Sequence, residues 1–306
     1  MPSSVSSFKA TLVGGTAVLL WATLALLTTL SGNTPPFQLT AMAFSIAFLI
    51  GLSLWRRQGG PIWRHVRLPG RVWALGIFGL FGYHFFYFMA LRNAPAVEAS
   101  LIAYLWPLLI VFFSALLPGE KLRWFHWVGA VIAFAGAALL VTKGQGLSFE
   151  ARYGLGYLAA LVCALTWSTY SLLSRRFGAI PTNAVGGFCG ATAMLALLCH
   201  LLFEQTVWPV GVEWLAILLL GLGPVGVAFF TWDYGVKRGN IKVLGAFSYA
   251  APLLSTLLLI GFGLAEPSWL LALACVFIVG GAVLAAGDFF RVSAPPPVEQ
   301  QSPEWS

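Results

Sequence analysis

Charged residues are scarce in this sequence. Asp, Glu, Lys and Arg make up 9% of the 306 residues, whereas hydrophobic residues make up 59%. A soluble domain of ordinary composition carries roughly 25% charged residues, so these few charges cannot cover a water-exposed surface of this size. The composition therefore excludes an ordinary soluble protein and predicts a chain that is solvated mainly by lipid.

The residue types that build metal and catalytic sites are also few and scattered. They are Cys163, Cys189, Cys199 and Cys275, and His65, His84, His126 and His200. The cysteines lie in apolar stretches without CxxC spacing, as is usual for small buried hydrophobes, and no glycine-rich loop ends in GK[ST]. We therefore expect no metal, no cofactor and no catalytic residue. A membrane-embedded enzyme is the weakest alternative, because it would need clustered His, Asp or Glu.

Ten apolar segments are each long enough to cross a bilayer, which takes roughly 20 residues. They are 10–30, 37–55, 72–91, 97–117, 124–142, 153–174, 184–204, 212–236, 241–263 and 268–290. Their apolar runs are continuous rather than alternating, which favours helices over a β-barrel. We predict an all-α integral membrane protein with ten transmembrane helices, followed by a disordered polar tail over 292–306.

The net charge of +7 comes from basic residues in the short loops between apolar segments. They form no continuous stripe, so we expect no nucleic-acid partner. If the N-terminus is cytoplasmic, three of the 17 Lys and Arg lie outside (Arg92, Lys143 and Arg152) and the other fourteen lie inside. Cytoplasmic loops carry the excess of Lys and Arg, so this bias predicts that both termini are cytoplasmic.

The two halves of the chain resemble each other at a nearly constant offset. The matching pairs are Tyr104 and Tyr249, Pro107 and Pro252, and Trp124 and Trp269 at 145 positions, and Trp21 and Trp167 at 146. Because five spans is an odd number, the second half enters the membrane from the opposite side. We predict an inverted repeat with units 9–146 and 147–291. Such repeats are typical of transporters; a repeat kept only for assembly is the alternative.

The duplication, the Trp-x-Thr at Trp21 and Trp167, and the Pro-Leu-Leu at Pro107 and Pro252 resemble the EamA-type branch of the drug/metabolite transporter superfamily. The resemblance covers residues 9–291. It implies a basket of ten helices, monomeric in a bacterial inner membrane, with a central substrate cavity formed by spans 1, 3, 4, 6, 8 and 9.

Two short motifs within that branch are similar to those of aromatic amino-acid exporters. They are Gly82-Tyr83-His84 and Ala103-Tyr104-Leu105-Trp106-Pro107. This similarity implies secondary transport of aromatic and other neutral amino acids out of the cytoplasm by alternating access. Another neutral metabolite or a drug remains an alternative small-molecule substrate.

No Asp, Glu, Lys or Arg lies near the middle of a predicted span, since Glu204, Asp233 and Asp288 lie near span ends. Intramembrane charges normally mark ion or proton pathways, and a strongly charged substrate would need Lys or Arg in its site. The sequence therefore favours a neutral or zwitterionic substrate and leaves proton coupling open.

Aromatic and polar side chains near span centres are the candidate substrate contacts. They are Trp21, Tyr83, His84, Tyr104, Trp106, Trp167, Ser248 and Tyr249. Aromatic faces stack on an aromatic substrate and attract an ammonium group, with ordinary packing as the alternative for each. Tyr104 and Trp106 are two positions apart on a helix, so we do not expect both to contact substrate in one conformation.

Four of the candidate positions have a specific alternative. His84 either lines the cavity or is a buried neutral histidine bonded to a neighbouring helix, and Ser248 either binds substrate or bonds its own backbone. Pro107 and Pro252 each remove an intrahelical hydrogen bond, so they are candidate hinges for alternating access, or static kinks.

Overall fold

The structure, a computed structural model, describes residues 4–59, 61–147 and 150–285. The predicted tail over 292–306, the end of the tenth predicted span and Asp288 lie outside the described residues. Within the described part, every regular element is a helix and none is a strand. The prediction of an all-α fold is therefore confirmed.

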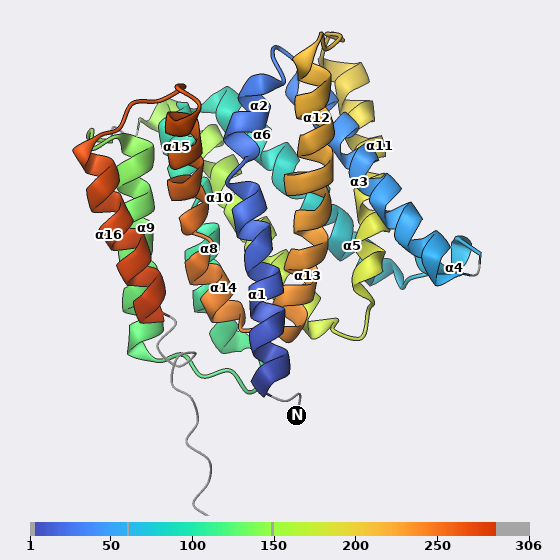
Figure 1. The fold of residues 1–306 in the computed structure, drawn as a ribbon, viewed down its shortest axis with the longest axis horizontal. Helices are drawn as coiled ribbons and strands as arrows, with labels where there is room; N and C mark the ends of the chain where they lie inside the picture. The colour runs from blue at the N-terminus through green and yellow to red at the C-terminus, as the bar shows by residue number, and fades with distance from the viewer. Residues whose placement is uncertain (1–3, 60, 148–149, 286–306) are drawn as a thin grey trace, which may run out of the picture.

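Proline and glycine mark several helix ends in the first half of the chain (Figure 1). Pro36 opens its helix, where its missing N–H would have had no partner, and Gly59 follows the end of that helix with a φ of 75° that favours glycine. The helices are α1 (Ser4–Trp21), α2 (Leu24–Leu30), α3 (Pro36–Gln58), α4 (Trp63–Val66), α5 (Gly70–Ile77), α6 (Tyr83–Asn93), α7 (Ala96–Ala103), α8 (Trp106–Phe113) and α9 (Trp124–Thr142), with a π-helical turn η1 (Phe78–Gly82) and a 3-10 turn η2 (Ser114–Leu116).

The second half follows a similar order of elements, with the single helix α10 in the place of α1 and α2. Asn240 begins one of its helices by accepting hydrogen bonds from the backbone N–H groups of Lys242 and Val243, at 3.1 and 3.2 Å, which satisfies donors left free at a helix start. The helices are α10 (Gly154–Arg176), α11 (Val185–Phe203), α12 (Val212–Leu222), α13 (Ala228–Arg238), α14 (Ile241–Phe247), α15 (Ala250–Gly261) and α16 (Trp269–Ala285), with 3-10 turns η3 (Ala151–Tyr153) and η4 (Thr182–Ala184) and a π-helical turn η5 (Gly223–Val227).

Nine helical stretches among the described residues are long and apolar enough to cross a membrane. They are Ser7–Leu30, Pro36–Gln58, Gly70–Asn93, Ala96–Leu116, Trp124–Thr142, Ala151–Arg176, Thr182–Phe203, Val212–Arg238 and Ile241–Gly261. The tenth predicted span corresponds to α16, an apolar helix described over 17 residues. We number these ten stretches as spans 1 to 10, and each overlaps its predicted segment.

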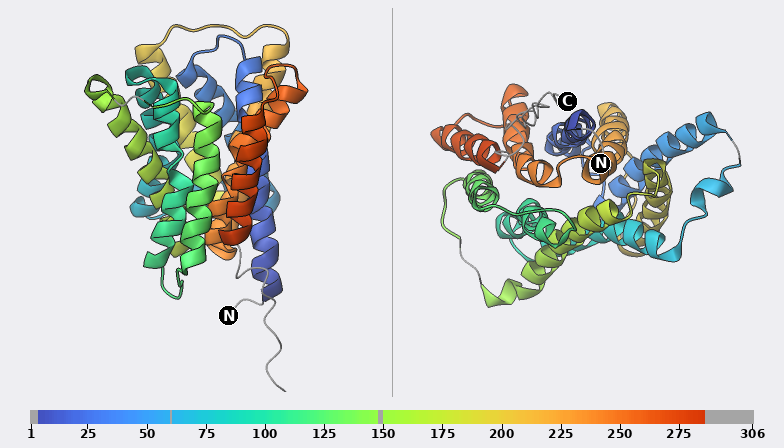
Figure 2. Two further views of the ribbon diagram at one scale, coloured as in Figure 1. Left: turned by 90° about the vertical axis from the view of Figure 1, so that its left-hand side faces the viewer. Right: turned by 90° about the horizontal axis from the view of Figure 1, so that it is seen from below.

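The two halves pack span against span in a pattern that the repeat explains. Span 1 packs on span 8 and span 6 on span 3, while spans 2 and 7, 4 and 9, and 5 and 10 pair directly. Exchanging the two halves leaves this list of pairs unchanged, as a pseudo-twofold relation requires. Viewed from below in Figure 2, the helices surround a central region in a basket-like arrangement.

Small residues allow two of these pairs to approach closely. A Cβ atom added to Gly51 in α3 would lie 2.5 Å from the Cα of Gly186 in α11, and one added to Gly14 in α1 would lie 2.9 Å from the Cα of Gly235 in α13. Glycine at helix contacts is common in membrane proteins, because it lets backbones pack without an intervening side chain.

Five spans are irregular near their middles. Span 1 breaks between Trp21 and Leu24, and spans 4 and 9 break at Tyr104-Leu105 and Ser248-Tyr249. Spans 3 and 8 contain the π-helical turns η1 and η5, whose first residues are 145 positions apart. By contrast span 6, the repeat partner of span 1, is unbroken along α10. The two halves therefore share most irregularities but differ at the first span of each.

Candidate functional site

A cavity of about 640 Å³ lies between the two halves. Its walls come from spans 1, 2, 3, 4, 6, 8 and 9, so the structure adds span 2 to the six that the resemblance implied. The cavity reaches the exposed residues Leu24 and Thr28 of α2. We call the end of the bundle where α2 ends and α3 begins the open end, and the opposite end, where the N-terminus lies in Figure 1, the closed end.

Three tryptophans that line this cavity, Trp21, Trp106 and Trp167, form its floor, and a fourth, Trp232, packs against all three. Trp21 lies 6.0 Å from Trp106, 5.7 Å from Trp167 and 5.0 Å from Trp232 between ring centroids, and the first two contacts are edge to face. Trp232 is fully buried and donates from its indole nitrogen to the hydroxyl of Ser171 at 3.0 Å. Edge-to-face rings are a favourable packing geometry, so the cluster forms a stable barrier between the cavity and the closed end.

Flat aromatic faces make up the side wall. Phe44 and Phe229 are stacked at 5.6 Å with an interplanar angle of 18°, and His84 meets Phe44 edge to face at 5.1 Å. Tyr83 and Tyr87, one helical turn apart, are nearly parallel at 6.2 Å. All five residues line the cavity, which therefore offers stacking surfaces to a ring-shaped ligand.

The polar groups of the cavity are uncharged or, in the case of His84, titratable. No Asp, Glu, Lys or Arg is among the described residues that line it. The Nδ1 atom of His84 lies 2.7 Å from the carbonyl oxygen of Leu80. Because a carbonyl only accepts, Nδ1 carries the hydrogen, and in the neutral ring Nε2 is then an acceptor. The hydroxyls of Tyr87 and Ser100 lie 3.3 Å apart.

Six of the eight predicted contact residues line the cavity. They are Trp21, Tyr83, His84, Tyr104, Trp106 and Trp167. Tyr104 and Trp106 both reach it, contrary to the expectation from regular helix geometry, because the helix breaks at Tyr104-Leu105. His84 is bonded within its own helix rather than to a neighbouring one. Their contacts with a substrate remain predictions.

The structure places the other two predicted contacts, Ser248 and Tyr249, away from the cavity. Both are fully buried. The Ser248 hydroxyl donates to the carbonyl of Leu244 at 2.7 Å, which is the alternative the sequence left open. The Tyr249 hydroxyl accepts from the backbone N–H of Leu108 at 3.0 Å. In this conformation, neither residue is available to a ligand in the cavity.

Sequence reasoning missed several lining residues. They include Phe44, Tyr87, Phe88, Phe229 and Ser255. Tyr87 and Phe88 lie four positions after Tyr83 and His84, and i, i+4 spacing on a helix could have identified them. Phe44 and Phe229 each share their span with another phenylalanine, and no sequence signal separates a lining ring from a lipid-facing one.

Ion pairs and charged hydrogen bonds hold the closed end together. Arg175, at the end of α10, donates to Glu120 at 2.8 Å and to the carbonyl oxygens of Val236 and Gly239 at 3.0 and 2.6 Å. Lys242 lies 3.1 Å from the other oxygen of Glu120. Because Glu120 belongs to the first half and the other four residues to the second, this cluster fastens the halves to each other.

At the open end, Glu204 is a buried carboxylate with a structural role. It accepts from the backbone N–H groups of Phe37 and Gln38 at the start of α3, at 3.0 and 3.1 Å, and lies 3.0 Å from Nδ1 of His200. A carboxylate at a helix N-terminus is favourable. Across the described residues, no group of three or more His, Cys, Asp or Glu is arranged to hold a metal ion.

A ten-helix membrane bundle made of two inverted halves, with a central cavity that is open at one end and closed at the other, defines a membrane transporter. The chain belongs to the EamA-like transporter family, whose model matches residues 8–142 and 154–287. Relatives from Ancylobacter, Salmonella and Escherichia are bacterial, and the protein is a multi-pass protein of the bacterial inner membrane.

Three similar proteins carry the same name, aromatic amino acid exporter YddG. The one from Ancylobacter novellus is 56% identical over 92% of this chain and 98% of its own length. Those from Salmonella typhimurium and Escherichia coli are 29% and 25% identical, over 83% and 90% of this chain and 88% and 96% of their own lengths. A solved crystal structure at 56% identity aligns with a TM-score of 0.86 over 90% of this chain and 97% of that chain.

Proposed function

We propose that this protein exports aromatic and other neutral amino acids from the cytoplasm by alternating access through the central cavity. The observation that carries this proposal is a 640 Å³ cavity lined by aromatic faces and by no Asp, Glu, Lys or Arg among the described residues. Its volume falls in the range of small-molecule sites. The names of the three relatives support the same substrate class.

The cavity offers a separate partner for each part of an aromatic amino acid. The side-chain ring rests on the tryptophan floor beside the aromatic side wall, and aromatic faces also attract a nearby cation. The ammonium group donates to Nε2 of His84, because Nδ1 is already the donor to Leu80. The carboxylate accepts from tyrosine hydroxyls such as that of Tyr104. No catalytic residue or cofactor is needed for such transport, and the protein is not an enzyme.

The charges at the two ends support a cytoplasmic closed end. Arg175, Lys237 and Lys242 lie at the closed end, whereas Arg92 lies in the last turn of span 3 at the open end. An excess of basic residues marks the cytoplasmic side, so both termini are cytoplasmic and the cavity opens outward in this conformation. One chain supplies all of the walls of the cavity, which supports a monomer as the working unit, with no nucleic-acid partner.

Purified protein in liposomes is expected to move labelled phenylalanine down its concentration gradient, and unlabelled tryptophan or tyrosine to compete. Flux into protein-free liposomes is the control. If no amino acid is transported while another neutral metabolite or a drug is, the substrate class proposed here is wrong. Repeating the measurement with and without a pH gradient tests proton coupling, because only a coupled transporter concentrates phenylalanine against its gradient.

Pro107 and Pro252 are proposed as hinges. They are repeat-related, and the helix breaks at Tyr104-Leu105 and Ser248-Tyr249 each lie within one turn before the proline. Both prolines lie in the first turn of a helix, Pro107 in α8 and Pro252 in α15, and replacing them by alanine supplies the N–H donors with which each helix could continue across its break. Pro107→Ala with Pro252→Ala is therefore expected to slow phenylalanine flux several-fold.

The control for the hinge variant is Pro118→Ala, which changes an exposed proline in the loop after span 4. It is expected to leave flux unchanged. Undiminished flux in the double variant would show that the two kinks are static.

A further inference from the structure

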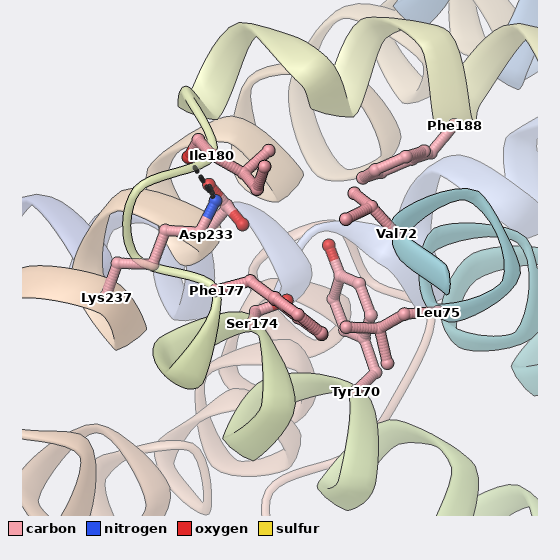
Figure 3. Close-up of a pocket in the computed structure, with 9 residues that line it drawn as sticks. All are labelled: Val72, Leu75, Tyr170, Ser174, Phe177, Ile180, Phe188, Asp233 and Lys237. Atoms are coloured by element: carbon pink, nitrogen blue, oxygen red, sulfur yellow. Dashed lines mark hydrogen bonds and ion pairs between the residues drawn. The ribbon is translucent and has the colours of Figure 1, made fainter. Parts of the chain in front are cut away.

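A second, much smaller pocket lies below the tryptophan floor, at the closed end (Figure 3). Its volume is about 10 Å³, room for roughly one water molecule. It lies among α5, α10, α11 and α13, and Figure 3 shows the Tyr170 side chain directed into it. Tyr170 also packs against Trp167 of the cavity floor, with ring centroids 5.2 Å apart. Tyr170 therefore connects this pocket to the floor of the central cavity.

The pocket is the repeat counterpart of the open mouth of the cavity. At the offset of 146 that relates Trp167 to Trp21, the counterparts of Tyr170, Ser174 and Ile180 are Leu24, Thr28 and Thr34. At the offset of 145, the counterpart of Asp233 is Phe88 and that of Leu75 is Leu220. All five counterparts line the large cavity. In a transporter with inverted halves, the mouth of one state corresponds to the sealed passage of the other. The small pocket is thus a collapsed mouth.

The collapsed mouth differs from the open one in carrying a pair of charges. Asp233 stands where the open mouth has Phe88, and Lys237 follows it by one helical turn on α13. The carboxylate and the ammonium group lie 2.7 Å apart, and their side chains are 2% and 7% exposed. Oδ2 of Asp233 also accepts from the hydroxyl of Thr182 at 2.8 Å, and Nζ of Lys237 donates to the carbonyl of Ile180 at 3.0 Å.

We propose that Asp233 and Lys237 form an entry subsite for zwitterionic amino acids when the closed end opens. Residues four apart share a helix face, so the two side chains present a negative and a positive group side by side. In the closed state each satisfies the other. When the mouth opens, the carboxylate of Asp233 accepts from the α-ammonium of the ligand and the ammonium of Lys237 donates to its α-carboxylate.

Tyr170 supplies an independent sign that this region is built to open. It is 1% exposed, and within the described residues its hydroxyl makes no more than a loose contact with Ser174. A buried polar group without a well-formed hydrogen bond is costly. Opening of the mouth relieves that cost by admitting water or ligand next to Asp233, on the path to Trp167. The subsite rests on the proposed amino-acid export, because it selects the same substrate class before the central cavity does.

The test compares ligands that lack one of the two charges. Inverted membrane vesicles expose the closed end, and uptake of labelled phenylalanine is inhibited by unlabelled phenylalanine, its methyl ester or N-acetylphenylalanine. Asp233→Asn is expected to weaken the preference for phenylalanine over the N-acetyl compound about tenfold, the scale of one charged hydrogen bond. Lys237→Gln is expected to weaken the preference over the methyl ester by the same factor, and each leaves the other preference intact.

Two controls distinguish a substrate-binding subsite from an ion pair that only keeps the mouth closed. Thr182→Val removes a hydrogen bond from Asp233 but no charge, so it should leave both preferences unchanged. Neutralising one partner of the pair leaves a buried unpaired charge. The double variant Asp233→Asn with Lys237→Gln avoids this, and it should lose the preference for phenylalanine over both the N-acetyl compound and the methyl ester. Competition from the open end, in right-side-out vesicles, should stay as in the wild type.

The subsite would be overturned if all variants lost phenylalanine uptake equally while their ligand preferences stayed unchanged. It would also be overturned if a variant changed its ligand preference to the same extent from both ends. Either result leaves phenylalanine transport by the wild-type protein intact. Absence of wild-type phenylalanine flux would instead overturn the proposed function, so the two failures are distinguishable.

Discussion

Replacing Trp167 by alanine is expected to reduce phenylalanine transport by about tenfold or more. Trp167 is 3% exposed and lines the cavity, and it contacts the rings of Trp21, Trp106 and Tyr83 at 5.7, 6.3 and 5.6 Å. Each such aromatic pair contributes about 0.5–1.5 kcal/mol beyond the area that it buries, and about 1.4 kcal/mol corresponds to a factor of ten. The loss of several pairs at once removes the floor on which a substrate ring would rest.

Initial rates in liposomes over a range of phenylalanine concentrations measure this effect. Trp167→Phe keeps a ring face and is expected to retain much of the rate. Trp269→Ala, which removes a 73% exposed tryptophan from α16, is the control for loss of an indole in general. Because core Trp→Ala changes can cost about 3–5 kcal/mol, the melting temperature of each variant in detergent should accompany the rates. A folded Trp167→Ala variant with wild-type kinetics would contradict the proposed role.

The span positions could be predicted from the sequence because hydropathy is a property of whole segments. Segment 124–142, for example, is recovered as α9 with the same ends. The offset between Trp21 and Trp167 predicted the duplication, and the family match to residues 8–142 and 154–287 agrees with two units. Such features depend on many residues at once, so the exact environment of any single side chain has little influence on them.

The details of the site could not be predicted in the same way, because they depend on local departures from helix geometry. The break at Tyr104-Leu105 brings Trp106 to the same cavity as Tyr104, which regular 3.6-residue periodicity does not allow. The repeat also misled at Tyr249. It is the counterpart of Tyr104, but it is fully buried and bonded to the backbone of Leu108. Sequence symmetry does not reveal which half lines the cavity in a given state.

This asymmetry is informative about mechanism. Two equivalent halves in one protein hold different conformations: span 1 is broken after Trp21, whereas span 6 continues through Trp167 to Arg176. The open mouth is lined by span 1, and the collapsed mouth by span 6. Alternating access then amounts to an exchange of conformations between the halves. The conformation adopted at any moment is set by the contacts that are present at one end only.

Arg175 links the two halves at the closed end through Glu120. Arg175→Gln is therefore expected to shift the protein toward the state in which this end is open. Its repeat counterpart, 146 positions earlier, is Thr29, an uncharged residue that lines the open mouth. Glu266, the counterpart of Glu120, is exposed and forms no ion pair within the described part of the chain. Hydrogen bonds to charged groups contribute about 1.5–3 kcal/mol each. Only the bond to Glu120 joins the two halves; discounted for the 25% exposure of the Arg175 side chain, its loss should shift the ratio of the two states by about tenfold.

Thiol labelling at paired positions reads out this shift directly, in a background in which the four native cysteines have been replaced. Ser174→Cys reports on the collapsed mouth and Thr28→Cys on its open counterpart, because both positions line their respective pockets. Adding Arg175→Gln should speed labelling by a membrane-impermeant maleimide at position 174 and slow it at position 28. Arg176→Gln removes the same charge from an exposed neighbour and should change neither rate. Unaltered labelling at both positions with Arg175→Gln would mean that the cluster around Glu120 does not hold the closed end shut.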